Sequence, residues 1–109
     1  MIRLTVLYNL PPGVDETDFL RWRLGEHQQY NSSMEGVVRT DFARIDARWT
    51  PDDPQTSAPY RFMTIVDWPD QASFERGFLD PQVQAQLADD LKRIDSPLFL
   101  ISEVLATSS

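Results

Sequence analysis

The order in which strand-like and helix-like segments alternate is the feature that most constrains the fold of this 109-residue sequence. In the first segment, Ile2, Leu4 and Val6 share one face of an extended chain, which is typical of a half-buried strand. The predicted elements are a strand from Ile2 to Tyr8, a helix from Asp15 to about Ser32, a strand from Val37 to Ala47, a loop from Thr50 to Pro59, a strand from Tyr60 to Trp68, a helix from Pro69 to Ile94 and a strand from Leu98 to Leu105. This β-α-β-β-α-β order indicates one α+β domain over residues 1–109, with a ferredoxin-like four-stranded antiparallel sheet and two helices on one face.

Short sequence signals set the ends of the two predicted helices. Asp15 is a typical N-cap residue, and acidic residues follow it in the first turn. In the second helix we expect an interruption at Asp80-Pro81, because proline disfavours helical backbone at the residue before it. Ser96-Pro97 is expected to end that helix for the same reason.

One face of the first predicted helix combines apolar residues with two polar ones. At about 100° per residue, Phe19, Leu24, His27 and Tyr30 share this face, and Leu20 belongs to it as well. Arg23 lies on the same face, which is unusual for a charged side chain. The face therefore holds the side chains of this helix that could act chemically inside the domain.

Composition narrows the possible partners. Ten basic and seventeen acidic residues give a net charge of −7, which disfavours nucleic acid and an anionic membrane surface. The chain has no cysteine, so thiolate chemistry and zinc–thiolate sites are excluded. We expect a cytoplasmic protein. The sheet face away from the helices carries too many apolar residues to stay in water, so we also expect a homodimer in which two such faces pair.

His27 is the only histidine and the leading candidate for acid–base chemistry. Arg23 and Asn31 lie one helical turn to either side of it, and Tyr30 lies three residues on. Neutral His27 could move a proton, while Arg23 could bind an anionic group or a carbonyl oxygen and Tyr30 could donate a hydrogen bond. The alternative remains open that His27 is a packed core or interface residue satisfied by one backbone acceptor.

Other side chains are candidates for binding rather than catalysis. Tyr8 ends the first strand and Tyr60 begins the third, and each could orient a ligand oxygen, although a half-buried tyrosine with a solvated hydroxyl is the more common case. The aromatic residues suit a small hydrophobic ligand. One histidine and no cysteine support no metal site, and the scattered glycines form no phosphate-binding or dinucleotide-binding loop. We therefore expect no metal and no cofactor.

Several stretches of the sequence are similar to known families. The first strand, the turn after it and the helix holding Phe19 and His27 resemble EthD-like proteins, and two later stretches resemble RedY/HapK-like proteins. The residues concerned are 2–8, Pro11-Pro12-Gly13-Val14-Asp15, Phe78-Leu79-Asp80-Pro81-Gln82-Val83-Gln84 and Pro97-Leu98-Phe99-Leu100-Ile101-Ser102-Glu103. Both families belong to the dimeric α+β barrel superfamily, so the resemblance implies a ferredoxin-like protomer, a barrel formed across a dimer and a pocket between helices and sheet.

The resemblance also suggests a range of activities. Members of the superfamily include lactone isomerases, polyketide cyclases, cofactor-free monooxygenases and haem-degrading enzymes, and fold alone does not choose among them. His27 matches the position of a pocket histidine in related isomerases, but their second histidine has no counterpart here. The resulting hypothesis is a cofactor-independent isomerase or cyclase that tailors a small aromatic or polyketide-like metabolite in secondary metabolism. The alternatives are a non-catalytic binding or pathway-accessory protein and a cofactor-free monooxygenase.

Overall fold

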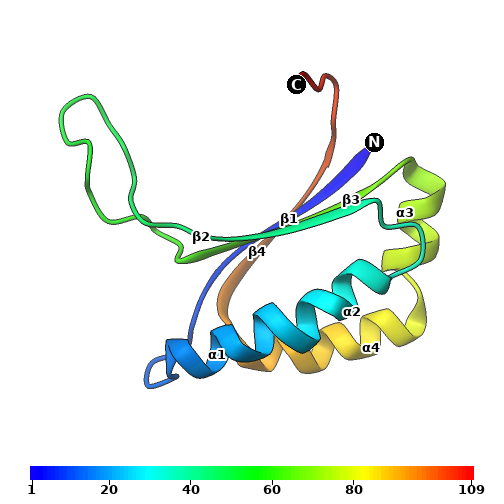
Figure 1. The fold of residues 1–109 in the computed structure, drawn as a ribbon, viewed down its shortest axis with the longest axis horizontal. Coiled ribbons are helices and arrows are strands. Elements are labelled where there is room, and N and C mark those ends of the chain that lie inside the picture. The colour runs from blue at the N-terminus through cyan, green and yellow to red at the C-terminus, as the bar shows by residue number, and fades with distance from the viewer.

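In a computed structural model that describes residues 1–109, helices cover one face of a four-stranded antiparallel sheet (Figure 1). The sheet has the spatial order β2-β3-β1-β4 and consists of β1 (Ile2–Asn9), β2 (Arg39–Arg44), β3 (Phe62–Trp68) and β4 (Asp95–Glu103). The helices are α1 (Glu16–Trp22), the π-helix η1 (Arg23–His27), α2 (Gln28–Ser33), α3 (Gln71–Phe78), α4 (Pro81–Asp90) and the 3₁₀-helix η2 (Leu91–Arg93). The predicted ferredoxin-like β-α-β-β-α-β fold is confirmed.

The first helical segment contains a π-helical turn that the sequence pattern did not predict. The backbone N–H of Gln28 donates to the carbonyl of Arg23, five residues earlier, so η1 is wider than an α-helix. This turn leaves Arg23 1% exposed and Leu24 61% exposed. The expectation that Leu24 lies on the inner face was therefore wrong, because it assumed a uniform α-helical period.

Aspartate side chains cap the helices where the sequence signals indicated. Asp15 accepts a hydrogen bond from the backbone of Asp18 and begins α1. Asp80 caps α4, and Pro81 occupies its first turn, so the predicted interruption at Asp80-Pro81 is confirmed. Asp70 caps α3 in a capping box with Ser73.

The strand ends differ from the sequence predictions. β4 begins at Asp95 and ends at Glu103, so the predicted range Leu98 to Leu105 was wrong at both ends. Pro97 lies inside this strand because β4 is at the edge of the sheet, where a missing N–H donor can face away from the ladder. β2 is shorter than predicted and β3 begins at Phe62 instead of Tyr60. The segment between them, including the predicted loop, extends away from the body of the protein (Figure 1).

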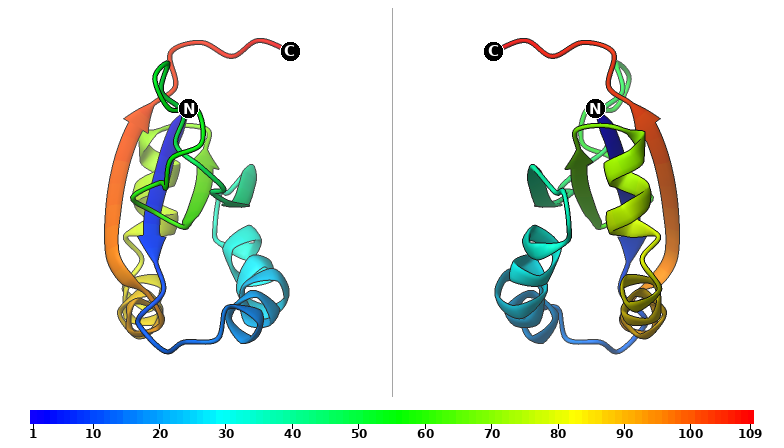
Figure 2. Two further views of the ribbon diagram at one scale, coloured as in Figure 1. Left: turned by 90° about the vertical axis from the view of Figure 1, so that its left-hand side faces the viewer. Right: turned by 90° about the vertical axis from the view of Figure 1, so that its right-hand side faces the viewer.

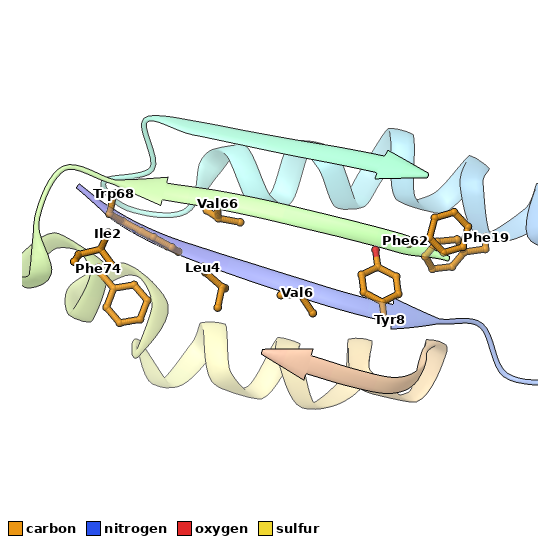
Figure 3. Packing of buried hydrophobic residues seen from close by; sticks show 9 residues of the cluster. All are labelled: Ile2, Leu4, Val6, Tyr8, Phe19, Phe62, Val66, Trp68 and Phe74. Carbon is orange, nitrogen blue, oxygen red and sulfur yellow. The ribbon is translucent and has the colours of Figure 1, made fainter. Parts of the chain in front are cut away.

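The core lies between the sheet and the helices. Ile2, Leu4, Val6 and Tyr8 project from β1 to the same side (Figure 3). They pack with buried residues from β3, α1 and α3, namely Phe62, Val66, Trp68, Phe19 and Phe74. The period of two in β1 therefore directs one apolar row towards the helices, as predicted.

Candidate functional site

A cavity of about 90 Å³ lies between the inner face of the sheet and the two helical segments. The helices α1, η1 and α2 form one wall and α4 with η2 forms the other (Figure 2). Of the 19 lining residues 14 are hydrophobic, and the other five are Arg23, His27, Asn31, Thr64 and Asp90. Such a mostly apolar cavity with a few polar groups is typical of sites for small molecules. An engineered cavity of about 150 Å³ holds benzene, so this one accepts part of a single aromatic ring or a smaller group.

A second, more open and more polar cleft adjoins the cavity. It measures about 390 Å³ and shares Tyr30, Met34 and Val83 with the cavity wall. Glu35 and Arg76 both line the cleft and form an ion pair, with 3.7 Å between the Glu35 carboxylate and Arg76 Nε. A ligand larger than the cavity can therefore extend into this cleft.

His27 is held between two aromatic rings at the cavity wall. Its imidazole stacks on Trp22 at a centroid distance of 4.4 Å and on Tyr30 at 6.0 Å. Trp22 is covered on its other side by the guanidinium of Arg93, 4.3 Å from the ring centroid. These contacts restrict the imidazole to one orientation, which a proton-transferring group requires.

Asp90 of α4 approaches His27 from the opposite wall. The distance from His27 Nδ1 to Asp90 Oδ2 is 3.5 Å, and Gln86 donates a 3.0 Å hydrogen bond to the other carboxylate oxygen. A 3.5 Å separation is long for a hydrogen bond, and catalytic contacts often shorten only when substrate binds. With Nδ1 facing Asp90, the proton of the neutral ring belongs on Nδ1, so Nε2 is the basic nitrogen.

The protonation states of this pair follow from burial. Burial, together with the positive charges of Arg23 and Arg93, lowers the pKa of His27 to about 4. Burial also raises the pKa of Asp90, against the lowering effect of its hydrogen bond from Gln86. His27 is therefore neutral at neutral pH, and the same lowering of its pKa makes it a weaker base than a free imidazole.

Arg23 is a buried cation without a carboxylate partner. Its guanidinium donates to Gln28 Oε1 at 2.7 Å and to Thr64 Oγ1 at 3.1 Å, and it lies 4.2 Å from the ring centroid of Phe42. Burial lowers the pKa of Arg23 while the nearby Tyr8 raises it. Tyr8 shares Thr64 with Arg23, because the Tyr8 hydroxyl and Thr64 Oγ1 are 3.2 Å apart.

The structure brings most of the sequence-predicted site residues together. His27, Arg23, Tyr8, Tyr30 and Asn31 all line the cavity. Tyr60 does not line it, because β3 begins two residues later and Tyr60 lies half-buried in the connection that precedes the strand. Tyr60 is therefore no longer a candidate for contact with a ligand in this cavity.

Sequence reasoning missed Thr64 and Asp90. Thr64 is a polar residue between Phe62 and Val66 on the inner face of β3, and this break in an apolar row was a usable signal. Asp90 follows Leu87 and precedes Leu91 in the cavity-lining stripe of the last helix, where an acidic residue is unexpected. Thr64 contacts Arg23 and Tyr8, and Asp90 contacts His27, each on another element, so these contacts depend on the fold. No three His, Asp or Glu side chains come together as potential metal ligands, and no helix is long and apolar enough to cross a membrane.

Fold and cavity together define a small ferredoxin-like protein with an apolar pocket. Over residues 2–105 the chain matches the family described as REDY-like protein HapK, and it belongs to that family. No curated protein matches the sequence.

Solved structures support the same fold. An EthD family protein from Bacillus halodurans C-125 has a TM-score of 0.76 at 19% identity, covering 96% of this chain and 99% of its own. A dimeric ferredoxin-like protein of unknown function from Thermobifida fusca YX has a TM-score of 0.71 at 14% identity, covering 94% of this chain and 90% of its own. SnoaB, a cofactor-independent oxygenase from Streptomyces nogalater, has a TM-score of 0.66 at 11% identity, covering 97% of this chain and 94% of its own. The EthD-like and HapK-like resemblance of the sequence is thus confirmed.

Proposed function

We propose that this protein is a small cofactor-independent enzyme that moves a proton on a small aromatic or polyketide-like metabolite, as an isomerase or cyclase of secondary metabolism does. The observation that carries the proposal is a neutral imidazole in an apolar cavity, fixed between Trp22 and Tyr30 and facing Asp90. A pKa of about 4 keeps this imidazole unprotonated at neutral pH. General acid–base catalysis of this kind contributes about 10²–10⁴ in rate.

Each cavity residue has a role in this mechanism. Nε2 of His27 accepts a proton from the substrate and returns it at another position. The carboxylate of Asp90 faces Nδ1 of His27 and stabilises the imidazolium that forms while His27 carries the proton. Arg23 and Tyr8 bind an oxygen group of the substrate, and Tyr30 and Asn31 position the rest of the ligand.

Solvent-deuterium exchange tests the proton transfer even while the natural substrate is unidentified. Small aromatic ketones and lactones are incubated with protein in D₂O, and deuterium incorporation at carbon is measured by mass spectrometry. We expect exchange with wild type, a loss of at least about 100-fold in His27→Gln, and no change in Arg21→Gln, which alters an exposed residue of α1. Unchanged exchange in a folded His27→Gln variant would refute the role of His27.

An oxygenase is the second candidate function, because SnoaB shares this fold and is a cofactor-independent oxygenase. The largely apolar cavity suits an electron-rich aromatic substrate. Oxygen consumption that depends on such a substrate, without deuterium exchange, would favour the oxygenase function. Ligand binding with neither exchange nor oxygen uptake would indicate a non-catalytic binding protein.

We also propose that the protein acts as a homodimer through the sheet face away from the helices. Leu98 and Leu100 are exposed on this face, 39% and 46%, next to half-buried Leu7 and Ile65. A dimeric ferredoxin-like protein is among the structural neighbours.

We expect Leu100→Lys to lower the mass measured by light scattering to that of a monomer. Ile101→Lys is the matched control, because Ile101 pairs with Leu4 and lies on the opposite face. A wild-type monomer at micromolar concentration would contradict the dimer.

A further inference from the structure

Arg23 brings a positive charge to the cavity wall that no carboxylate offsets. The residue is 1% exposed, and none of the ion pairs in the structure includes it. A buried charge is costly unless an opposite charge accompanies it. Asp67, the other fully buried charged residue, has such a partner in Arg3 at 2.8 Å. Arg23 has only neutral hydrogen-bond acceptors.

The guanidinium of Arg23 has N–H donors left for a further acceptor. A guanidinium has five N–H donors, and the two hydrogen bonds to Gln28 and Thr64 do not use all of them. The ring of Phe42 covers the guanidinium, and Arg23 itself is part of the cavity wall. Tyr8 adds a hydroxyl at the same end of the cavity, through its contact with Thr64.

We propose that the cavity selects ligands carrying a negatively charged oxygen group on an aromatic ring, with that group bound by Arg23 and the ring extending along the apolar walls towards the adjoining cleft. A carboxylate is the group that a guanidinium binds best, because two parallel N–H donors match its two oxygens. This inference rests on the proposed function and adds the charge of its substrate. It concerns binding alone, so it can be tested separately from catalysis.

The geometry also couples the bound anion to His27. The charge of Arg23 is one of the causes that lower the pKa of His27, alongside burial and Arg93. A carboxylate on Arg23 offsets that charge, while Asp90 continues to face Nδ1. We therefore expect the pKa of His27 to rise when an anionic ligand binds and not to rise when a neutral one does.

Benzoate and benzamide are the matched probes, since they share ring and shape and differ in charge. Both are titrated into wild-type protein, and binding is followed by NMR on backbone amides of η1. We expect benzoate to bind at least about tenfold more tightly than benzamide. In Arg23→Gln that preference should disappear, whereas in Arg21→Gln, which removes an exposed cation of the same helical segment, it should remain.

Two outcomes would overturn the proposal. Equal binding of the two probes to wild type is one, and a benzoate preference that persists in folded Arg23→Gln is the other. If Arg23→Gln fails to fold, the wild-type comparison and the rise of the His27 pKa with benzoate decide the question. His27→Gln separates this inference from the proposed function: it should lose exchange activity yet keep the benzoate preference, so either proposal can fail alone.

Discussion

Gly77 lets α3 pack closely against the segment that follows α2 and against β3. It lies in α3 against the Glu35 carbonyl and the Trp68 indole, and Trp68 Nε1 donates a 3.0 Å hydrogen bond to that carbonyl. A Cβ at position 77 would lie 2.6 Å from Trp68 Nε1 and closer still to the Glu35 oxygen. Because neither neighbour is the end of a flexible side chain, Gly77→Ala must displace α3 or break the hydrogen bond.

The expected cost combines three magnitudes. Overpacking costs about 1–3 kcal/mol, and a lost hydrogen bond costs about 1 kcal/mol. The better helix propensity of alanine returns about 0.5–1 kcal/mol. We therefore expect Gly77→Ala to lower the free energy of unfolding by about 2 kcal/mol, which corresponds to a fall in Tm of roughly 10 °C for a domain of this size.

Urea unfolding followed by circular dichroism measures this cost, with Gly25→Ala as the matched control. Gly25 lies in η1, and a Cβ there meets nothing within 4 Å. Since alanine is the better helix former, Gly25→Ala should be neutral or stabilising by up to about 1 kcal/mol. A Gly77→Ala variant as stable as wild type would refute the steric reasoning, and equal destabilisation in both variants would show that the contacts at Gly77 are not the cause.

Three further predictions concern titration, capping and packing. An NMR titration of the His27 ring should give a pKa of about 4, and a value near 6.5 would contradict the burial argument. Because the pKa is then lower in the folded than in the unfolded chain, the unfolded chain binds the proton more readily. The stability of wild type relative to His27→Gln should therefore fall as the pH drops from about 6.5 to about 4. Asp15→Ala removes the hydrogen bond to the Asp18 backbone and should cost about 0.5–2 kcal/mol in urea unfolding; a smaller loss would mean that the cap contributes little. Phe62→Ala empties a fully buried position and should cost about 3–5 kcal/mol in the same assay, whereas a loss below about 1 kcal/mol would indicate that the core collapses around it.

Local signals predicted much of the fold. Asp15, Asp80 and Pro81 mark helix ends through their own side chains or backbone, so their effect requires no distant partner. The period of two in β1 was sufficient to choose its buried face. The ends of β4 were predicted less well, because strand ends depend on pairing with β1, and Pro97 is tolerated only at the sheet edge.

The sequence predicted the site residues of the first helical segment and Tyr8 of β1, but missed Thr64 of β3 and Asp90 of α4. His27, Arg23, Tyr30 and Asn31 lie within nine residues of one another, so helical spacing alone grouped them. Asp90 is distant in the chain and reaches His27 only because α4 packs opposite η1. No local pattern contains that information.

The amino-acid sequence by itself determined the order of elements, the helix caps and a single imidazole on an inward helix face, because these follow from periodicity and from residues adjacent in the chain. Tertiary structure decided the rest. The π-helical turn directs Arg23 into the interior and Leu24 out of it, and the position of α4 across the cavity from η1 brings Asp90 to His27. The pKa of His27 and the unpaired charge of Arg23 also arise from tertiary structure, since desolvation depends on what surrounds a group in space and not on its neighbours in sequence.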